Sequence, residues 1–328
     1  MKYLYWLLLI LFPFGQAFKS FHLNDLIVGV IGGIGIIWGI REKNKLIKPL
    51  ILFCGLMAFT NPVYAARWLA YAGLYFFAKD FIQKKHLVIL ALTVAGIGIL
   101  QYIFLPDVSF LAAAGWDDHY YRLTFPFLDP GFTGIILVLG ILGGLGDLRK
   151  LGIIFTALLL TYSRASYLAY LVGFGVISFY KKSVKIFLLA ALVLIIGIFL
   201  LPKNFGEGTK LARENSVWAR VHNWQQTVTL WQTAPVLGVG MDKYQGKDSS
   251  LLMVLATTGV VGLAAYLWVV REVWEVGKKN MIFKVSFLAV FVHSWFNNTL
   301  FYPFVMEWLW LLLALSSSDS RLDRSPRQ

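Results

Sequence analysis

Long apolar runs, separated by short polar or basic connections, follow one another along almost the whole chain. The apolar runs cover residues 3–18, 24–40, 46–60, 62–78, 86–105, 131–146, 151–162, 166–180, 184–201, 250–270, 281–296 and 299–316. A helix of about 20 apolar residues crosses the hydrocarbon core of a bilayer, and a shorter one does so where a neighbouring helix shields it. The pattern predicts an all-α polytopic membrane protein with about 12 transmembrane helices.

Two longer polar stretches interrupt this pattern, at residues 106–130 and 202–249. The second stretch carries apolar residues at helical spacing, namely Val217, Trp218, Val221, Trp224, Val228 and Trp231. This spacing predicts an amphipathic helix that lies on the membrane surface. The first apolar run is followed directly by another and has no small-residue cleavage site, which favours an anchored span over a removable signal peptide.

The composition agrees with a membrane protein and excludes several kinds of site. With 58% hydrophobic residues and a mean hydropathy of +0.68, the chain is too apolar for an ordinary soluble domain. Its single cysteine, Cys54, lies inside an apolar run, which excludes an intrachain disulfide and a cysteine-based metal site. The histidines are not paired at helical spacing, and no glycine-rich nucleotide loop follows a strand. We therefore expect no metal and no cofactor.

The formal net charge of +13 arises from basic residues that cluster at the ends of the apolar runs. This arrangement is typical of membrane orientation, so we expect the lipid bilayer, and no nucleic acid, as the partner of this charge. If the N-terminus lies inside, the inner connections hold two thirds of the Lys and Arg residues. We expect one domain, residues 1–316, in the cytoplasmic (inner) membrane, with both long loops outside. Both termini would be cytoplasmic, with a disordered tail at residues 317–328.

One arginine stands where a membrane helix should be. The segment around TYSRAS has inner-type charges on both sides, so it should enter the membrane and return. Its arms, residues 151–162 and 167–180, are too short to span the core fully, so Ser163 and Arg164 should lie below the outer surface. An arginine at that depth is tolerated mainly where it faces a cavity, a counter-ion or water. The alternative is one long tilted helix whose Arg164 side chain snorkels to the surface.

The two outer loops contain further polar candidates. The first loop combines aromatic residues with Asp117, Asp118, His119, Arg122 and Asp129. Its aromatic rings either stack on sugars or form an interfacial belt, whereas the Arg122 guanidinium offers a rigid fork for phosphate oxygens. In the expected amphipathic helix, Arg220, His222 and Asn223 face either solvent or a site. A lone histidine such as His222 is more often a surface residue than a catalyst.

The second loop ends in a glycine-rich turn followed by an apolar helix. Pro235, Gly238 and Gly240 end the amphipathic helix and permit tight turns. The residues Asp248, Ser249 and Ser250 then offer an N-cap for the helix that follows. This places a carboxylate at the outer mouth of a membrane helix, where the helix dipole favours an anion. Asp248 is either only a helix cap or a functional group.

Taken together, these segments resemble the O-antigen ligase and polymerase family. The resemblance rests on TYSRAS, on DPGFTG entering a helix, on an arginine-rich helix ending in APVLGVG, and on the motif that opens the next span. The family motif there is His followed by Asn or Ser, then any nine residues, Gly, any two residues and Gly. Ser249, Gly259 and Gly262 match this spacing, and Asp248 stands where the ligases carry histidine. The resemblance covers about residues 106–316, including the late HSWFNNTLFYP.

The resemblance implies a membrane glycosyltransferase that takes a glycan from an undecaprenyl-diphosphate-linked donor and passes it to an acceptor hydroxyl on the outer face. The acceptor is a glycan, a lipid or a protein, and neither metal nor cofactor is needed. Arg122, Arg164 and Arg220 would clamp the diphosphate. Asp248 would be the general base, with His222 or His119 as substitutes. The supporting residues would be Ser163, Ser249, Gly259, Gly262 and Asp129.

A multispan transporter or flippase for an anionic or lipid-linked substrate is the alternative function, because a cationic cavity open to the outer face also suits anion passage. Many transporters are built from two related halves, with broken helices in corresponding positions. The sequence contains no visible internal repeat. It therefore favours the glycosyltransferase.

Overall fold

The computed structural model describes residues 1–16, 23–202, 205–211, 215–244, 246 and 248–322. Over these residues the fold is all-helical, with thirteen α-helices and no strand beyond one isolated bridge between Asp107 and Tyr120. The α-helices are α1 Lys2–Leu11, α2 Leu23–Arg41, α3 Ile47–Ala58, α4 Pro62–Ala78, α5 Lys84–Phe104, α6 Pro130–Gly144, α7 Leu148–Leu160, α8 Arg164–Tyr180, α9 Val184–Leu200, α10 Asn215–Gln232, α11 Ser250–Gly277, α12 Met281–His293 and α13 Pro303–Leu322. The 3-10 turns are η1 Phe12–Phe14, η2 Ser109–Ala114, η3 Glu207–Thr209, η4 Met241–Lys243 and η5 Thr299–Phe301.

Each apolar run expected from the sequence coincides with a helix, and α10 coincides with the expected amphipathic helix. Three helical stretches in the described part of the chain are long and apolar enough to cross a membrane: Asn24–Arg41, Lys84–Phe104 and Ser250–Gly277. Several other helices are apolar but shorter. The all-α fold is therefore confirmed and its helices fit a membrane protein, whereas the number of spans stays a prediction.

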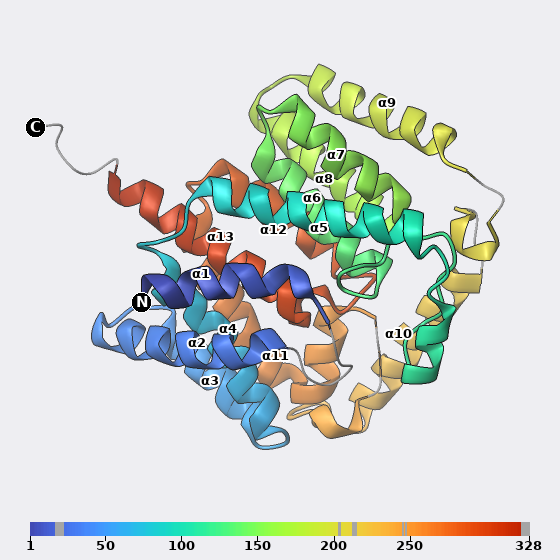
Figure 1. Ribbon diagram of the computed structural model, residues 1–328. Coiled ribbons are helices and arrows are strands. Elements are labelled where there is room, and N and C mark those ends of the chain that lie inside the picture. Colours follow the sequence, from blue (N-terminus) through green and yellow to red (C-terminus); the bar gives the residue numbers. More distant parts are fainter. Residues whose placement is uncertain (17–22, 203–204, 212–214, 245, 247, 323–328) are drawn as a thin grey trace, which may run out of the picture.

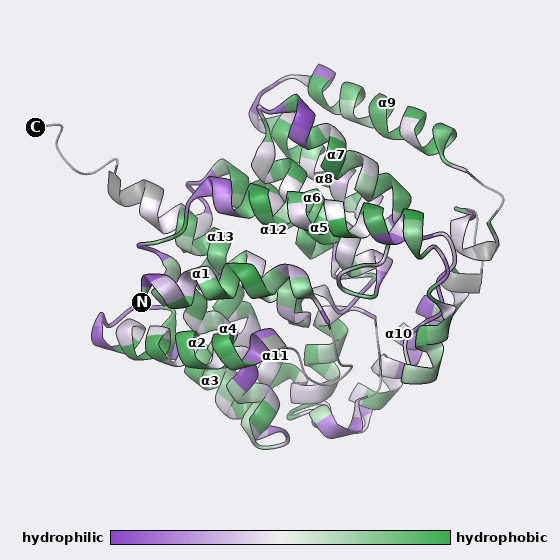
Figure 2. Cartoon of the chain, viewed as in Figure 1, coloured by the Kyte–Doolittle hydropathy of each residue, from purple (hydrophilic) through white to green (hydrophobic). Residues whose placement is uncertain are grey.

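The helices lie side by side across the molecule, and the chain passes repeatedly from one end to the other (Figure 1). The N-terminus and the end of α13 lie at the same end, and α10 lies at the opposite one (Figure 1). The helices are largely apolar along their lengths, and polar residues gather near the ends (Figure 2). This arrangement leaves a polar end of the bundle, far from the N-terminus, on which a site can be built.

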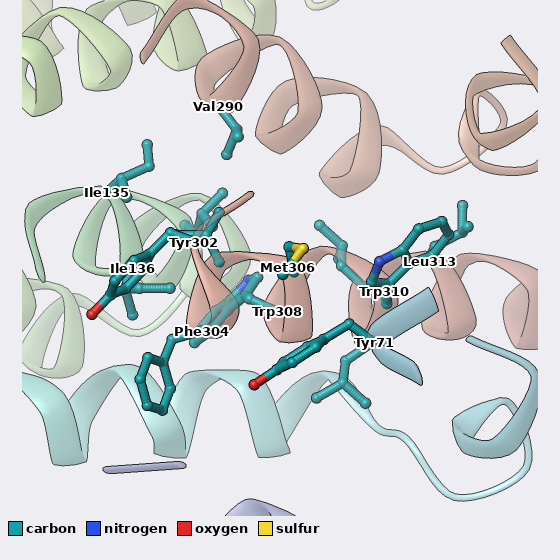
Figure 3. Close-up of a cluster of buried hydrophobic side chains, with 14 of the residues drawn as sticks. Tyr71, Ile135, Ile136, Val290, Tyr302, Phe304, Met306, Trp308, Trp310 and Leu313 are labelled. Carbon is teal, nitrogen blue, oxygen red and sulfur yellow. The ribbon is translucent and has the colours of Figure 1, made fainter. Parts of the chain in front are cut away.

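The helix α13 lies at the centre of the packed helices. Figure 3 shows its side chains, Trp308 among them, packed between Tyr71 of α4, Ile135 and Ile136 of α6, and Val290 of α12. All five of these side chains are almost completely buried. Close packing of this kind holds membrane helices together, since lipid offers little hydrophobic driving force for their association.

The first helix boundary differs from the expected apolar run at residues 3–18. The helix α1 ends at Leu11 and passes into η1, because Pro13 lacks the amide N–H that would continue the α-helix. The last two residues of that run lie outside the described residues.

The last helix is longer than expected. The helix α13 continues to Leu322, so residues 317–322 of the expected tail are helical. The hydroxyls of Ser317 and Ser318 donate to the carbonyl of Ala314, and Ser318 also contacts the carbonyl of Lys79, which ties this turn to α4. Residues 323–328 lie outside the described part of the chain.

The helix α11 is interrupted at Gly259, where φ is 65° and ψ is −168°. Few residues other than glycine adopt this backbone conformation, and a Cβ at Gly259 would lie 2.2 Å from the carbonyl oxygen of Val236. Four backbone hydrogen bonds join the loop at residues 235–240 to α11 on both sides of the interruption: Val239 N to Ala256 O at 2.8 Å, Gly240 N to Thr257 O at 3.0 Å, Val260 N to Pro235 O at 3.0 Å and Val261 N to Val236 O at 3.3 Å. The loop thus replaces the helical hydrogen bonds that the interruption removes.

Candidate active site

A cavity of about 630 Å³ lies where α6 and α8 begin, beside α10 and the residue before the N-cap of α11. It lies at the end of the bundle away from the N-terminus, because Gln16, beyond α1 and η1, and Tyr302, just before α13, both line it. The predicted site residues that line it are Arg122, Asp129, Ser163, Arg164, Arg220 and Asp248. These residues lie far apart in the sequence, so the fold brings most of the predicted site together.

Arg122 is held against the connection between α7 and α8. Only 8% of its surface is exposed. Its Nε donates to the carbonyl of Thr161 at 3.0 Å, and its own carbonyl accepts from Gln101 Nε2 at 3.3 Å. The Arg122 guanidinium is therefore held by the Thr161 carbonyl, and the Arg122 backbone by the Gln101 side chain.

Arg164 is the first residue of α8, and a break separates this helix from α7, which ends at Leu160. Tyr162 adopts a positive φ of 50° within the break. The Ser163 hydroxyl caps α8 by accepting from the amide of Ser166 at 3.3 Å. Arg164 Nη1 donates to the carbonyl of Leu211 at 3.1 Å. Arg164 thus lines the cavity directly after a break between two helices, and the single long helix is wrong.

Arg220 comes from the amphipathic helix α10. Its guanidinium carbon lies 5.8 Å from the ring centroid of Phe296, a cation–π distance. Arg220 is near enough to Arg164 for the two positive charges to act on each other. Two guanidinium groups placed side by side at a cavity favour an anion between them.

Asp248 lies at the cavity but does not cap α11. The N-cap is Ser249, whose hydroxyl accepts from the amide of Leu252 at 3.4 Å. The Asp248 carboxylate instead accepts from Asn223 Nδ2 of α10 at 2.7 Å. The helix-cap interpretation of Asp248 is therefore wrong, and its carboxylate is held in place from the neighbouring helix.

Asp129 has a different task, because it caps α6. Its Oδ1 accepts from the amides of Gly131 and Phe132 at 2.7 and 2.8 Å. The carboxylates of Asp117, Asp129 and Asp248 all line the cavity with the three arginines. Since Asp129 is bound by helix amides and Asp248 by an asparagine, both have hydrogen-bond donors other than the arginines.

The two histidines considered as substitute bases lie in different places. His222 is exposed, its Nε2 lies 2.9 Å from Gln226 Nε2, and it does not line the cavity. His119 lines the cavity, and its Nε2 has no hydrogen-bond partner within the described residues. Burial, together with the positive charge of Arg122, lowers the pKa of His119 to about 4. His119 is therefore neutral at pH 7 and is the histidine placed to act at the cavity.

The remaining supporting residues, Ser249, Gly259 and Gly262, do not line the cavity. Ser249 begins α11 with a positive φ of 62°. Gly259 forms the interruption described above, and a Cβ at Gly262 would lie 2.0 Å from Thr258 Oγ1. Only Ser249 adjoins Asp248, whereas Gly259 and Gly262 lie within α11.

The sequence did not reveal the polar groups behind these residues. His293 at the end of α12 is completely buried, with Nε2 3.3 Å from Ser166 Oγ and Nδ1 2.7 Å from Thr299 Oγ1. Asn297, four residues after His293, lines the cavity. The only local signal was HSWFNNTLFYP, a polar interruption between two apolar runs.

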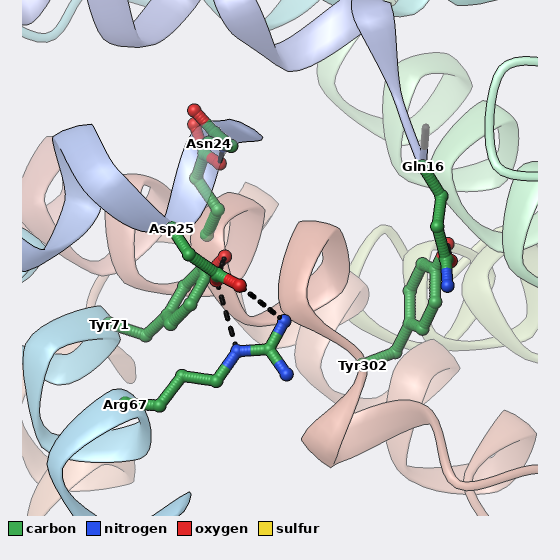
Figure 4. Close-up of polar contacts among 7 residues, drawn as sticks. Gln16, Asn24, Asp25, Arg67, Tyr71 and Tyr302 are labelled. Atoms are coloured by element: carbon green, nitrogen blue, oxygen red, sulfur yellow. Dashed lines mark hydrogen bonds and ion pairs between the residues drawn. The ribbon is translucent and has the colours of Figure 1, made fainter. Parts of the chain in front are cut away.

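A second polar group lies beside the cavity, between α2, α4 and α13 (Figure 4). Arg67 forms an ion pair with Asp25 at 2.9 Å, and the Tyr71 hydroxyl donates to Asp25 at 2.8 Å. Figure 4 shows this pair facing the region of Gln16 and Tyr302, where the Tyr302 hydroxyl donates to Gln16 Oε1 at 2.9 Å. Asp25, Arg67 and Tyr71 line a different cavity from the candidate site.

Comparison with known proteins adds one finding. A family model described as O-antigen ligase matches residues 151–267. No curated protein matches the chain. The matched segment runs from α7 into α11 and includes Arg164, Arg220 and Asp248, whereas Arg122 precedes it. Over residues 151–267 this match is to the same family that the sequence resemblance indicated.

Proposed function

We propose that this protein is a membrane glycosyltransferase that moves a glycan from an undecaprenyl-diphosphate-linked donor to an acceptor hydroxyl on the outer face of the cytoplasmic membrane. The observation that carries the proposal is the convergence of Arg122, Arg164 and Arg220 with Asp248 on one cavity. The acceptor is a hydroxyl of a glycan, a lipid or a protein. The match to the O-antigen ligase family supports a reaction of this type.

The three arginines supply the site for the diphosphate. A guanidinium group presents its N–H donors in a rigid plane that suits phosphate oxygens. The carbonyls of Thr161 and Leu211 hold Arg122 and Arg164 before any substrate binds. A bound diphosphate also offsets the repulsion between Arg164 and Arg220.

Asp248 acts as the general base. It takes the proton of the acceptor hydroxyl while the hydroxyl oxygen attacks the anomeric carbon of the donor glycan. The bond between that carbon and the diphosphate oxygen breaks, and its electron pair leaves with undecaprenyl diphosphate. The arginines stabilise the charge that builds on this leaving group, and Asn223 orients the carboxylate. Asp248 then releases its proton to water.

The outer-face location rests on the charge pattern. Connections at the N-terminal end of the bundle carry most of the Lys and Arg residues, which supports a cytoplasmic location for that end. The cavity lies beside Gln16 and Tyr302, at the far ends of α1 and α13 from the N-terminus. It therefore opens where a lipid-linked glycan already carried across the membrane would reach it.

The test is release of undecaprenyl diphosphate by purified protein in lipid nanodiscs. The protein is supplied with a lipid-linked glycan and with the polysaccharide fraction of the cells that make this protein. We expect release with the wild-type protein. Arg164→Lys keeps the charge but loses the planar fork, so turnover should fall by about 100-fold or more. Arg271→Lys, at an exposed position in the other half of α11, is the matched control and should keep full turnover.

Two outcomes would contradict this function. One is a donor that binds the wild-type protein but is never cleaved with any acceptor fraction. The other is movement of the intact donor across a sealed vesicle membrane without release of undecaprenyl diphosphate, which would indicate a transporter instead.

A further inference from the structure

The turn that follows α12 touches the starts of two other helices. His293, the last residue of α12, contacts Ser166 in the first turn of α8. The next residue, Ser294, accepts a hydrogen bond through its carbonyl from the amide of Ser250, the first residue of α11, at 2.9 Å. Two consecutive residues therefore contact the helix start that carries Arg164 and the helix start that follows Asp248.

The contacts on the α8 side form a closed group of buried hydroxyls. Ser166 Oγ lies 2.8 Å from Ser163 Oγ and 3.2 Å from the carbonyl oxygen of Gly131, besides its contact of 3.3 Å with His293 Nε2. One arrangement of protons satisfies these three contacts of Ser166: it donates to Gly131 and accepts from Ser163 and from His293 Nε2. Nε2 then carries the proton, so its 3.4 Å contact with Asn297 Nδ2 is not a hydrogen bond. Nδ1 of His293 then accepts from the Thr299 hydroxyl at 2.7 Å.

None of these groups needs to touch the substrate to influence the reaction. His293 is completely buried and Ser166 is 0% exposed, so both lie behind the cavity wall. Ser163, which Ser166 holds, does line the cavity and immediately precedes Arg164. A displacement of about 1 Å between a clamping group and a base can cost about 100-fold in rate.

We propose that His293 is a positioning residue for glycan transfer, which sets the placement of Arg164 relative to Asp248 by holding the Ser166 hydroxyl through its Nε2. This inference rests on the proposed function. It also assigns the second contact of His293, between Nδ1 and Thr299, to stability of the turn and not to the reaction.

The two amide variants of His293 separate the contacts. The side-chain amide of His293→Gln reaches about as far as Nε2, so it keeps a donor for Ser166. The shorter amide of His293→Asn reaches only the position of Nδ1, so it keeps Thr299 and loses Ser166. Both variants are neutral and polar. If His293 were only structural, the two variants would lose turnover equally, or His293→Asn, which keeps the shorter contact of 2.7 Å with Thr299, would retain more turnover.

The measurements are the turnover number for release of undecaprenyl diphosphate, the Kd for undecaprenyl diphosphate itself, and amide hydrogen exchange over residues 163–168. We expect His293→Asn to lower the turnover number by about 100-fold, with Kd changed by less than about threefold and faster exchange at the start of α8. His293→Gln should stay within about fivefold of wild type in turnover. Ser166→Ala should match His293→Asn, and the double variant should be no worse, because both remove one interaction.

Full turnover in His293→Asn overturns the proposal, as does an equal loss in His293→Gln and His293→Asn with both proteins folded. A loss confined to Kd also overturns it. Wild-type protein that binds undecaprenyl diphosphate but never releases it from a donor contradicts the proposed function instead. In that case amide exchange at residues 163–168 that is the same in His293→Asn as in wild type would still overturn the proposal that His293 holds Ser166, since exchange can be measured without the reaction.

Discussion

The amide of Val260 donates to the carbonyl of Pro235 at 3.0 Å, across the interruption of α11. This hydrogen bond and its three neighbours explain why a glycine-rich loop and a glycine within a membrane helix occur in the same sequence. The loop needs the free amides and carbonyls of a broken helix, and the broken helix needs the loop, since buried backbone groups left without partners are costly.

Gly259→Ala should therefore destabilise the protein. The positive φ at this position costs roughly 1–2 kcal/mol for a residue with a Cβ, and the Cβ would also meet the carbonyl of Val236 at 2.2 Å. We expect a lower midpoint of thermal unfolding in detergent. Gly96→Ala in α5, where a Cβ meets nothing within 4 Å, is the control and should be neutral or slightly stabilising. Equal midpoints for wild type and Gly259→Ala would contradict the role of the interruption.

Asp248→Asn should abolish turnover and leave folding unchanged, because Ser249 and not Asp248 caps α11. The variant removes the basic carboxylate but keeps an oxygen for Asn223. Release of undecaprenyl diphosphate, binding of undecaprenyl diphosphate and thermal unfolding should be measured side by side. Ser249→Ala is the reverse control and should cost about 1 kcal/mol of stability. An active Asp248→Asn protein would transfer the role of base to His119, which lines the same cavity.

The stability of the protein should fall as the pH is lowered from about 6.5 to about 4. Burial and the charge of Arg122 lower the pKa of His119 from 6.5 to about 4 in the folded protein. Within this window the unfolded chain binds more protons than the folded one, so acid favours unfolding, by roughly 1–3 kcal/mol in total. His119→Gln should remove this part of the pH dependence. Parallel curves of unfolding midpoint against pH for the two proteins would count against it.

The contact between Asn24 and Glu307 should matter for stability and not for the reaction. Both side chains are buried, and Asn24 Nδ2 donates to Glu307 Oε2. Asn24 Oδ1 and Glu307 Oε1 have no hydrogen-bond partner among the described residues. The amide introduced by Glu307→Gln can donate to Asn24 Oδ1, so this variant should unfold at the same or a higher temperature. Glu307→Leu leaves the Asn24 amide without a partner and should cost about 1–3 kcal/mol.

The orientation in the membrane can be read by labelling single cysteines after Cys54→Ala. Gln225→Cys in α10 and Lys181→Cys after α8 are both exposed positions at opposite ends of the bundle. In intact cells an impermeant thiol reagent should label the first and not the second, because the charge pattern predicts that the basic connections are cytoplasmic. A permeant reagent should label both. Labelling of Lys181→Cys alone would invert the topology, and with it the outer-face site.

The helices and the shared location of the three arginines could be predicted from the sequence because each leaves a local signal. Apolar runs mark the helices, and a charge inside a run, as at Arg164, marks a residue that must face a cavity or a partner. Arg122, Arg164, Arg220 and Asp248 were expected at one site and line one cavity. Whether they act there is for the variants to decide.

The groups behind the site could not be predicted, because their partners are distant in the chain. Asn223 contacts Asp248 across 25 residues, and His293 contacts Ser166 across 127. The polar stretch HSWFNNTLFYP marks the region of His293 but does not indicate which residue it contacts. His222 shows the opposite problem, since a helical pattern cannot tell which polar residue of α10 turns to the cavity and which to solvent.

The interruption at Gly259 also makes the direction of Asp248 independent of the length of α11. In a continuous helix, one inserted or deleted residue turns everything beyond it by about 100°, so the length of the membrane part would decide where Asp248 points. Here the part of α11 before Gly259 is oriented by the loop at residues 235–240 and by the hydrogen bond between Ser250 and Ser294. The part after Gly259 can therefore change in length to suit bilayers of different thickness without turning Asp248 away from the cavity.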